Sequence, residues 1–428
     1  MPEFAFPPHF LWGSAASSHQ VEGHNTKNDW WAWEQASRVK ESSGRACEHY
    51  QRFRDDFDLA ARLGHNAHRF SVEWSRVEPD EGVFDDEALA HYRDVVRALR
   101  ERHLEPIVTL HHFTTPQWLA KQGGWKHPKV VDAFARYSGR VIQALGADVR
   151  YWITINEPMV YVNMHYLDGI GPPGERNVVS AFQVIEHLVR AHGASHQALH
   201  EAARAGGWPI KVSVAKHVPL MVPCRSWWPG DRLITHLTHL TYNHAFLDAL
   251  SDGVLKLPGR KPLLISDAAR TLDYLGINYY SRVFMRMVPR WHTQWWGQRC
   301  DRNHHRQVTE RNALKWDVYP RGIYDVLMWA KRWNCELFIT ENGICAIDDP
   351  QRERFILRHL EWVARAIQDG APVLGYLYWS LTDNFEWAEG FGPRFGLVNI
   401  DYVTQARTIR SSAERFAKIC RTNRLSVP

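Results

Sequence analysis

Cysteine is scarce in this chain, and no two cysteines form a CxxC pair. The six cysteines are scattered over the 428 residues: Cys47, Cys224, Cys300, Cys335, Cys345 and Cys420. Their spacing matches neither a disulfide framework nor a metal-binding motif, so we expect reduced thiols in a reducing compartment. No run of about 18 apolar residues occurs, so no membrane span is expected. Residues 1–10 are too few and too rich in proline for a signal peptide, which favours a cytoplasmic protein.

Clusters of one charge are also absent. The net charge is +5, but lysine and arginine are spread along the chain without a basic tail. Nucleic acid is therefore not an expected partner. No GxGxxG follows the first expected strand, which argues against an open doubly wound sheet. We predict neither a cofactor nor a metal ion.

Tryptophan is the abundant residue type, with 20 copies in the chain. Part of this excess is expected to fill the core as bulky packing. The remainder is consistent with a wide aromatic-walled cleft that holds flat, apolar faces such as those of sugar rings.

Strand-like and helix-like segments alternate from end to end, without a linker between two halves. The expected strands cover residues 9–16, 67–74, 106–113, 150–155, 210–218, 273–280, 336–340 and 373–379. The expected helices cover residues 49–63, 85–103, 127–145, 178–205, 232–250, 319–333, 350–368 and 408–419. Residues 17–33 and 281–318 are predicted to be irregular. The pattern predicts a single (β/α)8 TIM barrel over residues 1–428, with an open doubly wound sheet as the rival.

Two of these strands end in a glutamate. The strand at 336–340 is followed by Glu341 and the turn dipeptide Asn-Gly, and the strand at 150–155 is followed by Asn156 and Glu157. Parallel barrels place their chemistry at the carboxyl ends of the strands. Two such glutamates are what a double-carboxylate hydrolase needs.

Other polar or aromatic side chains stand at the same end of the expected strands. They are Gln20, Arg69, His111, His112, Asn278, Tyr280, Trp379, Glu386 and Trp387. Each alone has an ordinary interpretation as a loop residue or a satisfied core polar group. Their shared position favours one functional mouth.

The chain resembles family 1 of the glycoside hydrolases, the β-glucosidase and β-galactosidase group. The similarity runs from residue 10 to residue 397. The family's acid/base motif is matched by Thr-Ile-Asn-Glu-Pro at 154–158, and its nucleophile motif by Ile-Thr-Glu-Asn-Gly at 339–343. Its sugar-binding stretch is matched by residues 379–387.

The resemblance implies catalytic roles. Glu341 is expected to be the ionised nucleophile, held in place by Arg69 and Tyr280. Glu157 is expected to be the acid/base, about 5–5.5 Å from Glu341 as in retaining enzymes. Asn156 is expected to bind the sugar 2-hydroxyl.

The resemblance also implies a substrate-binding set. Gln20, His112, Glu386 and Trp387 match residues that bind the outer hydroxyls of the glycone. Family members that act on 6-phosphosugars lack a carboxylate at the position of Glu386, so unphosphorylated sugars are expected. Trp379 is expected beneath the sugar ring and Trp316 at the aglycone site. Asn278 and Phe395 complete the predicted set.

Two positions depart from the family pattern. Phe113 and Met159 stand where tryptophan is common, which leaves the leaving-group preference open. The chain is also short for the family, which suggests trimmed loops and a more open cleft.

The leading interpretation is a retaining exo-β-glycosidase acting on small β-glycosides and oligosaccharides, as a monomer or homo-oligomer. A carbohydrate-binding protein without catalysis is disfavoured because both glutamates are present. A metal-dependent barrel hydrolase, suggested by 24 histidines, is disfavoured because no HxH follows the first strand. Transglycosylation at the same site stays open.

Overall fold

The structure, a computed structural model, describes residues 3–289, 297–302 and 304–426. Eight parallel strands close into a barrel in the order β10-β13-β14-β2-β3-β4-β5-β6. Their bounds are β2 Leu11–Ala15, β3 Ala67–Ser71, β4 Glu105–His111, β5 Tyr151–Asn156, β6 Lys211–His217, β10 Tyr274–Asn278, β13 Glu336–Asn342 and β14 Val373–Trp379. The predicted (β/α)8 barrel is confirmed. The assignment of residues 1–428 to one domain stays a prediction.

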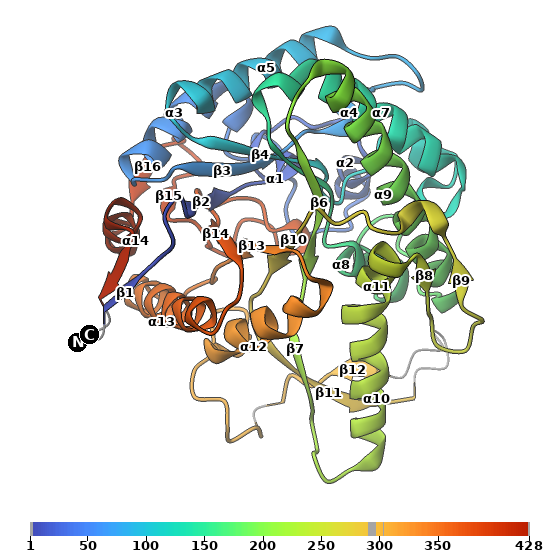
Figure 1. The fold of residues 1–428 in the computed structure, drawn as a ribbon, viewed down its shortest axis with the longest axis vertical. Helices are drawn as coiled ribbons and strands as arrows, with labels where there is room; N and C mark the ends of the chain where they lie inside the picture. The colour runs from blue at the N-terminus through green and yellow to red at the C-terminus, as the bar shows by residue number, and fades with distance from the viewer. Residues whose placement is uncertain (1–2, 290–296, 303, 427–428) are drawn as a thin grey trace.

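The long helices lie outside the barrel (Figure 1). They are α3 His49–Arg62, α5 Asp86–Glu101, α7 Lys129–Leu145, α9 Val178–Gly206, α10 Pro229–His239, α11 Ala245–Asp252, α12 Arg321–Ala330, α13 Asp349–Gln368 and α14 Ser411–Thr422. Side chains such as Val130, Phe134 and Val141 of α7 recur at helical spacing and are buried, which is the pattern of a helix with one face on a core. Among the described residues, no helix is both long and apolar enough to span a membrane.

Barrel strands are hydrophobic on both sides because helices cover them outside and packed side chains fill them inside. Every residue of β3 and β5 is buried. The interior holds its own apolar cluster, which includes Ile107, Ile153 and Phe338. The barrel is thus a rigid frame whose strand ends fix the positions of the side chains that follow.

The first and last described strands meet outside the barrel, at the left of Figure 1. There β1 (Glu3–Ala5) pairs antiparallel with β17 (Arg424–Ser426). Smaller pieces complete the described fold: α1 Ser18–Val21, α2 Asp29–Gln35, α4 Trp74–Val77, α6 Gln117–Lys121, η1 Gly124–Lys126, η2 Gly146–Asp148, α8 Pro158–Val162, η3 Asn163–Leu167, η4 Leu240–His244, β8 Val254–Leu255, β9 Leu263–Leu264, η5 Ser266–Ala268, η6 Lys331–Trp333 and η7 Trp387–Glu389.

Several predicted boundaries are wrong. The expected loop at 17–33 contains α1 and most of α2. The strand expected to reach residue 74 ends at Ser71, and Trp74 begins α4. The helix expected at 232–250 is interrupted by the π-helical turn η4. The last helix begins at Ser411 because β16 (Arg407–Ile409) first pairs with β15 (Val398–Ile400).

The segment 281–318 was predicted to be irregular, but part of it is regular. Its described part contains β11 (Arg282–Met287) and β12 (Gly297–Arg299), which form a three-stranded sheet with β7 (Leu220–Pro223). β11 is parallel to β7 and antiparallel to β12. Residues 290–296 and 303 of the predicted excursion lie outside the described residues.

Candidate active site

The carboxyl ends of the barrel strands bring the predicted polar residues together. Glu341 lies on β13, and Asn278 on the neighbouring β10 is its partner in the register. Arg69 lies on β3, and Asn156 is the last residue of β5. Glu157 follows as the residue that precedes α8, with a left-handed backbone (φ 45°). Its side chain lines the cavity at the point where the barrel opens.

Glu341 is 3% exposed, and its carboxylate accepts hydrogen bonds from two side chains. Arg69 donates from Nη1 to Oε1, and the Tyr280 hydroxyl donates to Oε2, each over 2.5 Å. Burial raises the pKa of Glu341, while the guanidinium of Arg69 and the hydroxyl of Tyr280 oppose that rise. Both carboxylate oxygens are therefore bonded in a way that favours the charged form.

Glu157 has a different environment. It is 8% exposed, and Asn278 Nδ2 donates to its Oε1 over 2.9 Å. Burial raises the pKa of Glu157 to about 8, and the nearby charge of Glu341 adds to the rise. A carboxyl with one neutral donor and a negative neighbour keeps its proton at neutral pH.

Asn156 and Asn278 connect the two carboxyls. Asn156 Oδ1 accepts from Arg69 Nη2 at 2.7 Å and from Asn278 Nδ2 at 3.2 Å. The amide of Asn278 bonds to Glu157 and also lowers the pKa of Glu341 through a hydrogen bond. One amide thus lies between both carboxyls, which places them close together.

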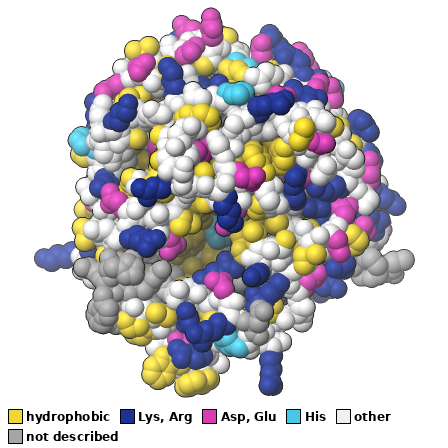
Figure 2. All heavy atoms as spheres, turned by 180° about the vertical axis from the view of Figure 1, so that it is seen from behind, with side chains coloured by type: hydrophobic (Ala, Val, Ile, Leu, Met, Phe, Trp, Pro, Cys, Tyr) yellow, Lys and Arg dark blue, Asp and Glu magenta, His cyan; other side chains and the backbone are white. Residues whose placement is uncertain are grey.

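A cavity of about 270 Å³ opens in front of these groups. Most of the predicted site residues line it: Gln20, His112, Glu157, Tyr280, Trp316, Glu341, Trp379, Glu386, Trp387 and Phe395. Arg69, Asn156 and Asn278 do not line it and lie buried behind Glu341 and Glu157. The face of the molecule behind the view of Figure 1 is hollowed near its centre, with apolar side chains in the hollow (Figure 2).

Aromatic rings form the walls of this cavity. His112 lies parallel to both Trp379 and Trp387, with centroid separations of 5.8 and 6.2 Å. Tyr280 packs edge-on to Trp316 at 6.0 Å. Such flat apolar surfaces suit the faces of a sugar ring.

Gln20 and Glu386 form the polar corner of the cavity. Gln20 lies in α1 rather than in the first strand, and its Nε2 donates to Glu386 Oε2 over 3.3 Å and to the Phe385 carbonyl over 2.8 Å. Burial raises the pKa of Glu386 to about 8, and the charge of Glu341 contributes. This corner offers both donors and acceptors to neighbouring hydroxyl groups.

Comparisons with known proteins agree with this geometry. The family described as "Glycosyl hydrolase family 1" matches residues 3–425. A 1,4-β-D-glucan glucohydrolase of Thermotoga neapolitana is 32% identical, over 98% of this chain and 99% of that protein. A β-glycosidase structure from Pyrococcus horikoshii is 39% identical, with a TM-score of 0.91 over 100% of this chain and 97% of that one. The 6-phospho-β-glucosidase GmuD of Bacillus subtilis is 30% identical, over 97% and 98%.

The chain belongs to glycosyl hydrolase family 1. It is a glycoside hydrolase of the β-glucosidase type, built on the TIM barrel of that family.

Sequence reasoning missed part of the cavity wall of this family 1 hydrolase. The missed lining residues are Val160, Met164, Ile170, His217, Ser281, Val283, Arg299, Ala388 and Glu389. His217 could have been found, because it is the last residue of β6 and so stands at a strand end. Val283 and Arg299 carried no such signal, because the sheet that holds them was not predicted.

The two departures from the family pattern fall in different places. Phe113 lines the cavity of this glycoside hydrolase and packs against Trp387, with ring centroids 5.2 Å apart. Met159 is buried in α8 and does not line the cavity. His111 is also buried, against Trp125, and does not line the cavity.

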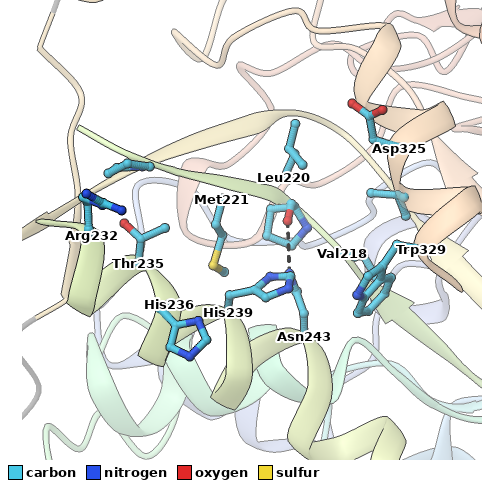
Figure 3. A pocket seen from close by; sticks show the side chains of 13 residues that line it. Val218, Leu220, Met221, Arg232, Thr235, His236, His239, Asn243, Asp325 and Trp329 are labelled. Carbon is cyan, nitrogen blue, oxygen red and sulfur yellow. Dashed lines mark hydrogen bonds between the residues drawn. The ribbon is translucent and has the colours of Figure 1, made fainter. Parts of the chain in front are cut away.

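A second hollow of about 470 Å³ lies between β7, α10 and α12 (Figure 3). Its wall includes His236, His239 and Trp329, and Asp325 is the one carboxylate among the described residues that line it. A glycosidase needs two carboxyl groups, so this hollow is not a rival for the active site.

Proposed function

We propose that this protein is a retaining exo-β-glycosidase that removes terminal, non-reducing β-D-glucosyl groups. β-D-galactosides and β-D-fucosides are further substrates. The observation that carries the proposal is the contrast between the two glutamates: Glu341 holds two charge-favouring donors, whereas the pKa of Glu157 is raised to about 8. One carboxyl is set up as a nucleophile and the other as an acid.

In the first step, the Glu341 carboxylate attacks the anomeric carbon and the bond to the leaving oxygen breaks. Glu157 transfers its proton to that oxygen as the bond breaks. Arg69 and Tyr280 hold the attacking oxygens in place. The amide of Asn278 lies between the carboxyl groups of Glu157 and Glu341 and so supports a short distance between them. Retaining enzymes have a carboxyl separation of about 5–5.5 Å, whereas inverting enzymes have about 6.5–9.5 Å.

In the second step, Glu157 is a carboxylate and removes a proton from water. The water oxygen attacks the anomeric carbon, and Glu341 leaves as a carboxylate. Asn156 lies behind the carboxyl pair with its Nδ2 3.0 Å from His112 Nε2. A sugar 2-hydroxyl that reaches Asn156 must replace or join that contact.

Gln20, His112, Glu386 and Trp387 are proposed to bind the glycone hydroxyls, with Trp379 beneath the ring and Trp316 and Phe395 towards the aglycone. Glu386 supports unphosphorylated sugars, because a carboxyl group, protonated or charged, offers a phosphate no cationic partner. A cytoplasmic location is proposed because all six cysteines are unpaired.

The deciding experiment is chemical rescue. Glu341→Gly should reduce hydrolysis of an aryl β-glucoside to less than about one hundredth, since the nucleophile is lost. Glu157→Ala should still form the glycosyl-enzyme from a substrate with a good leaving group, and added azide should yield a β-glycosyl azide.

Glu336→Gln is the matched control, because Glu336 lies on the same strand as Glu341 but at its opposite end. It should keep wild-type turnover. An α-configured azide product from Glu157→Ala, or full activity in Glu341→Gly, would contradict the assigned roles.

A further inference from the structure

Two cysteines and two histidines meet beside the three-stranded sheet, outside the catalytic cavity. The residues are Cys224, Cys300, His304 and His305, and one ligand atom of each lies within 4.8 Å of the others. Cys224 Sγ is 3.3 Å from His304 Nε2. The four residues come from two segments that are far apart in the sequence, so the spacing of the cysteines alone did not indicate this cluster.

The backbone holds this cluster in place. Cys224 follows β7, and its amide donates to the Met285 carbonyl over 2.7 Å. Cys300 follows β12, and its amide donates to the Phe284 carbonyl over 2.7 Å. Both cysteines are thereby fixed to β11, which lies between β7 and β12 (Figure 1).

His305 lies against the same strand, and the ring of His304 lies next to that of His305. The ring of His305 stacks on Phe284, with centroids 3.7 Å apart and planes 9° from parallel. The side chain of His305 is 8% exposed, and its Nε2 is buried without a hydrogen-bond partner among the described residues. A buried ring nitrogen of this kind needs a partner, because buried polar atoms are otherwise costly.

We propose that Cys224, Cys300, His304 and His305 bind one structural Zn²⁺ ion. Thiolate and imidazole ligands in a 2:2 set select tetrahedral zinc, and four protein ligands leave no position open for substrate. Bonds of about 2.3 Å to sulfur and about 2.0 Å to nitrogen put neighbouring ligand atoms about 3.3–3.8 Å apart. The separation of Cys224 Sγ and His304 Nε2 already has this value.

The ion would connect the sheet to the segment that follows β12. Arg299 precedes Cys300 and lines the catalytic cavity, as does Val283 on β11. Zinc would therefore fix one wall of the cavity without contact with Glu157 or Glu341. We expect loss of zinc to lower the melting temperature and to raise KM for bulky aglycones.

The first test is metal content, a measurement that does not depend on the proposed activity. The full chain, expressed with zinc and purified under reducing conditions, should contain about one zinc per chain by inductively coupled plasma mass spectrometry. The double variant Cys224→Ser/Cys300→Ser should contain none.

Two variants serve as controls for the metal content. Cys335→Ser removes a cysteine outside the cluster and should keep the zinc. His200→Ala removes the second cluster of this kind among the described residues, His196, His200 and Asp273, and should also keep it.

The second test covers the chance that a cysteine variant does not fold. His304 is exposed, so His304→Ala should fold. Its affinity for zinc, measured by competition with a chelator, should be at least about tenfold weaker than that of the wild type. Cobalt bound to the wild type should give the visible bands of tetrahedral thiolate coordination.

Three outcomes would overturn the proposal. The first is a reduced chain that binds neither zinc nor cobalt. The second is a chain whose mass is lower by two hydrogens, with Cys224 and Cys300 joined as a disulfide. The third is a double cysteine variant that folds and keeps its zinc.

Discussion

The two glutamates of this hydrolase differ in their neighbours. Glu341 bonds to a guanidinium and a phenol, whereas Glu157 bonds to an amide that is shared with Asn156. The sequence pattern places both at the ends of strands, and they were expected to lie together because the carboxyl ends of all strands in a parallel barrel lie at one face. It could not show their unequal pKa shifts, which depend on burial and on partners from other strands.

The pH dependence of kcat/KM should report the proton on Glu157. Above the pKa of about 8 the acid is lost, so kcat/KM should fall about tenfold per pH unit. Glu157→Gln carries no proton that titrates, so with an activated aryl glucoside this alkaline decline should disappear. Stopped assays from pH 5 to 10 measure both profiles, and an unchanged alkaline limb in the variant would assign it to another group.

Tyr280 should act through Glu341. Tyr280→Phe removes one of the two donors to Glu341, so kcat should fall by about a hundredfold and the acidic limb should move to higher pH. Tyr279→Phe is the control, because the Tyr279 hydroxyl donates to the Tyr319 carbonyl and does not line the cavity. Equal losses of kcat in both variants would point to a structural role.

Close contacts between elements matter at the ends of β13 and β14. A Cβ on Gly343 would lie 1.9 Å from the carbonyl oxygen of Trp379, the residue proposed beneath the sugar. Gly343→Ala should therefore displace Trp379, lower the free energy of unfolding by about 1–3 kcal/mol and raise KM.

The matched control is Gly139→Ala. Gly139 lies inside α7, and apart from its chain neighbours and the backbone of its own helix, no described atom is within 4 Å of its added Cβ. Helix propensity favours alanine, so this change should be neutral or stabilising by up to about 1 kcal/mol. Calorimetry and aryl glucoside kinetics on both variants test the contrast. Wild-type stability and KM in Gly343→Ala would show that the contact relaxes without cost.

The long, periodic elements were predictable because their patterns are set within the element itself. The helix predicted at 178–205 is observed as α9, with Asn177 as its N-cap and a left-handed Gly207 after its end. β11 was not predictable, because its pairing with β7 joins residues more than 60 positions apart. β12 pairs with β11 and so depends on that strand. The cavity residues Val283 and Arg299 were missed for the same reason.

Below about pH 7, two sets of buried groups dominate the dependence of the molecule's stability on pH; above that pH, buried Lys216, whose pKa burial lowers to about 7, contributes as well. Burial lowers the pKa of one set of histidines to about 3: His65, His68, His111, His165, His192, His217 and His359. The unfolded chain protonates them near pH 6.5, so stability should fall as the pH falls from about 6.5 to 3.

Buried carboxyls act in the opposite direction. Burial raises the pKa of Asp29, Glu157 and Glu386 to about 8. Between about pH 4 and 8 the folded state keeps protons that the unfolded chain has lost, so these groups make stability fall as the pH rises. The histidines outnumber them below pH 6.5, so the melting temperature should peak near pH 6.5–7.

Calorimetric scans from pH 4 to 9 test this maximum, and Glu386→Gln separates the two sets. The variant lacks a carboxyl that must stay protonated when folded, so its melting temperature should gain on the wild type as the pH rises from about 5 to 8. Glu101→Gln, whose side chain is 58% exposed, should show a constant difference. A wild-type melting temperature that climbs steadily to pH 9 would show that the buried carboxyls are already ionised in the folded protein.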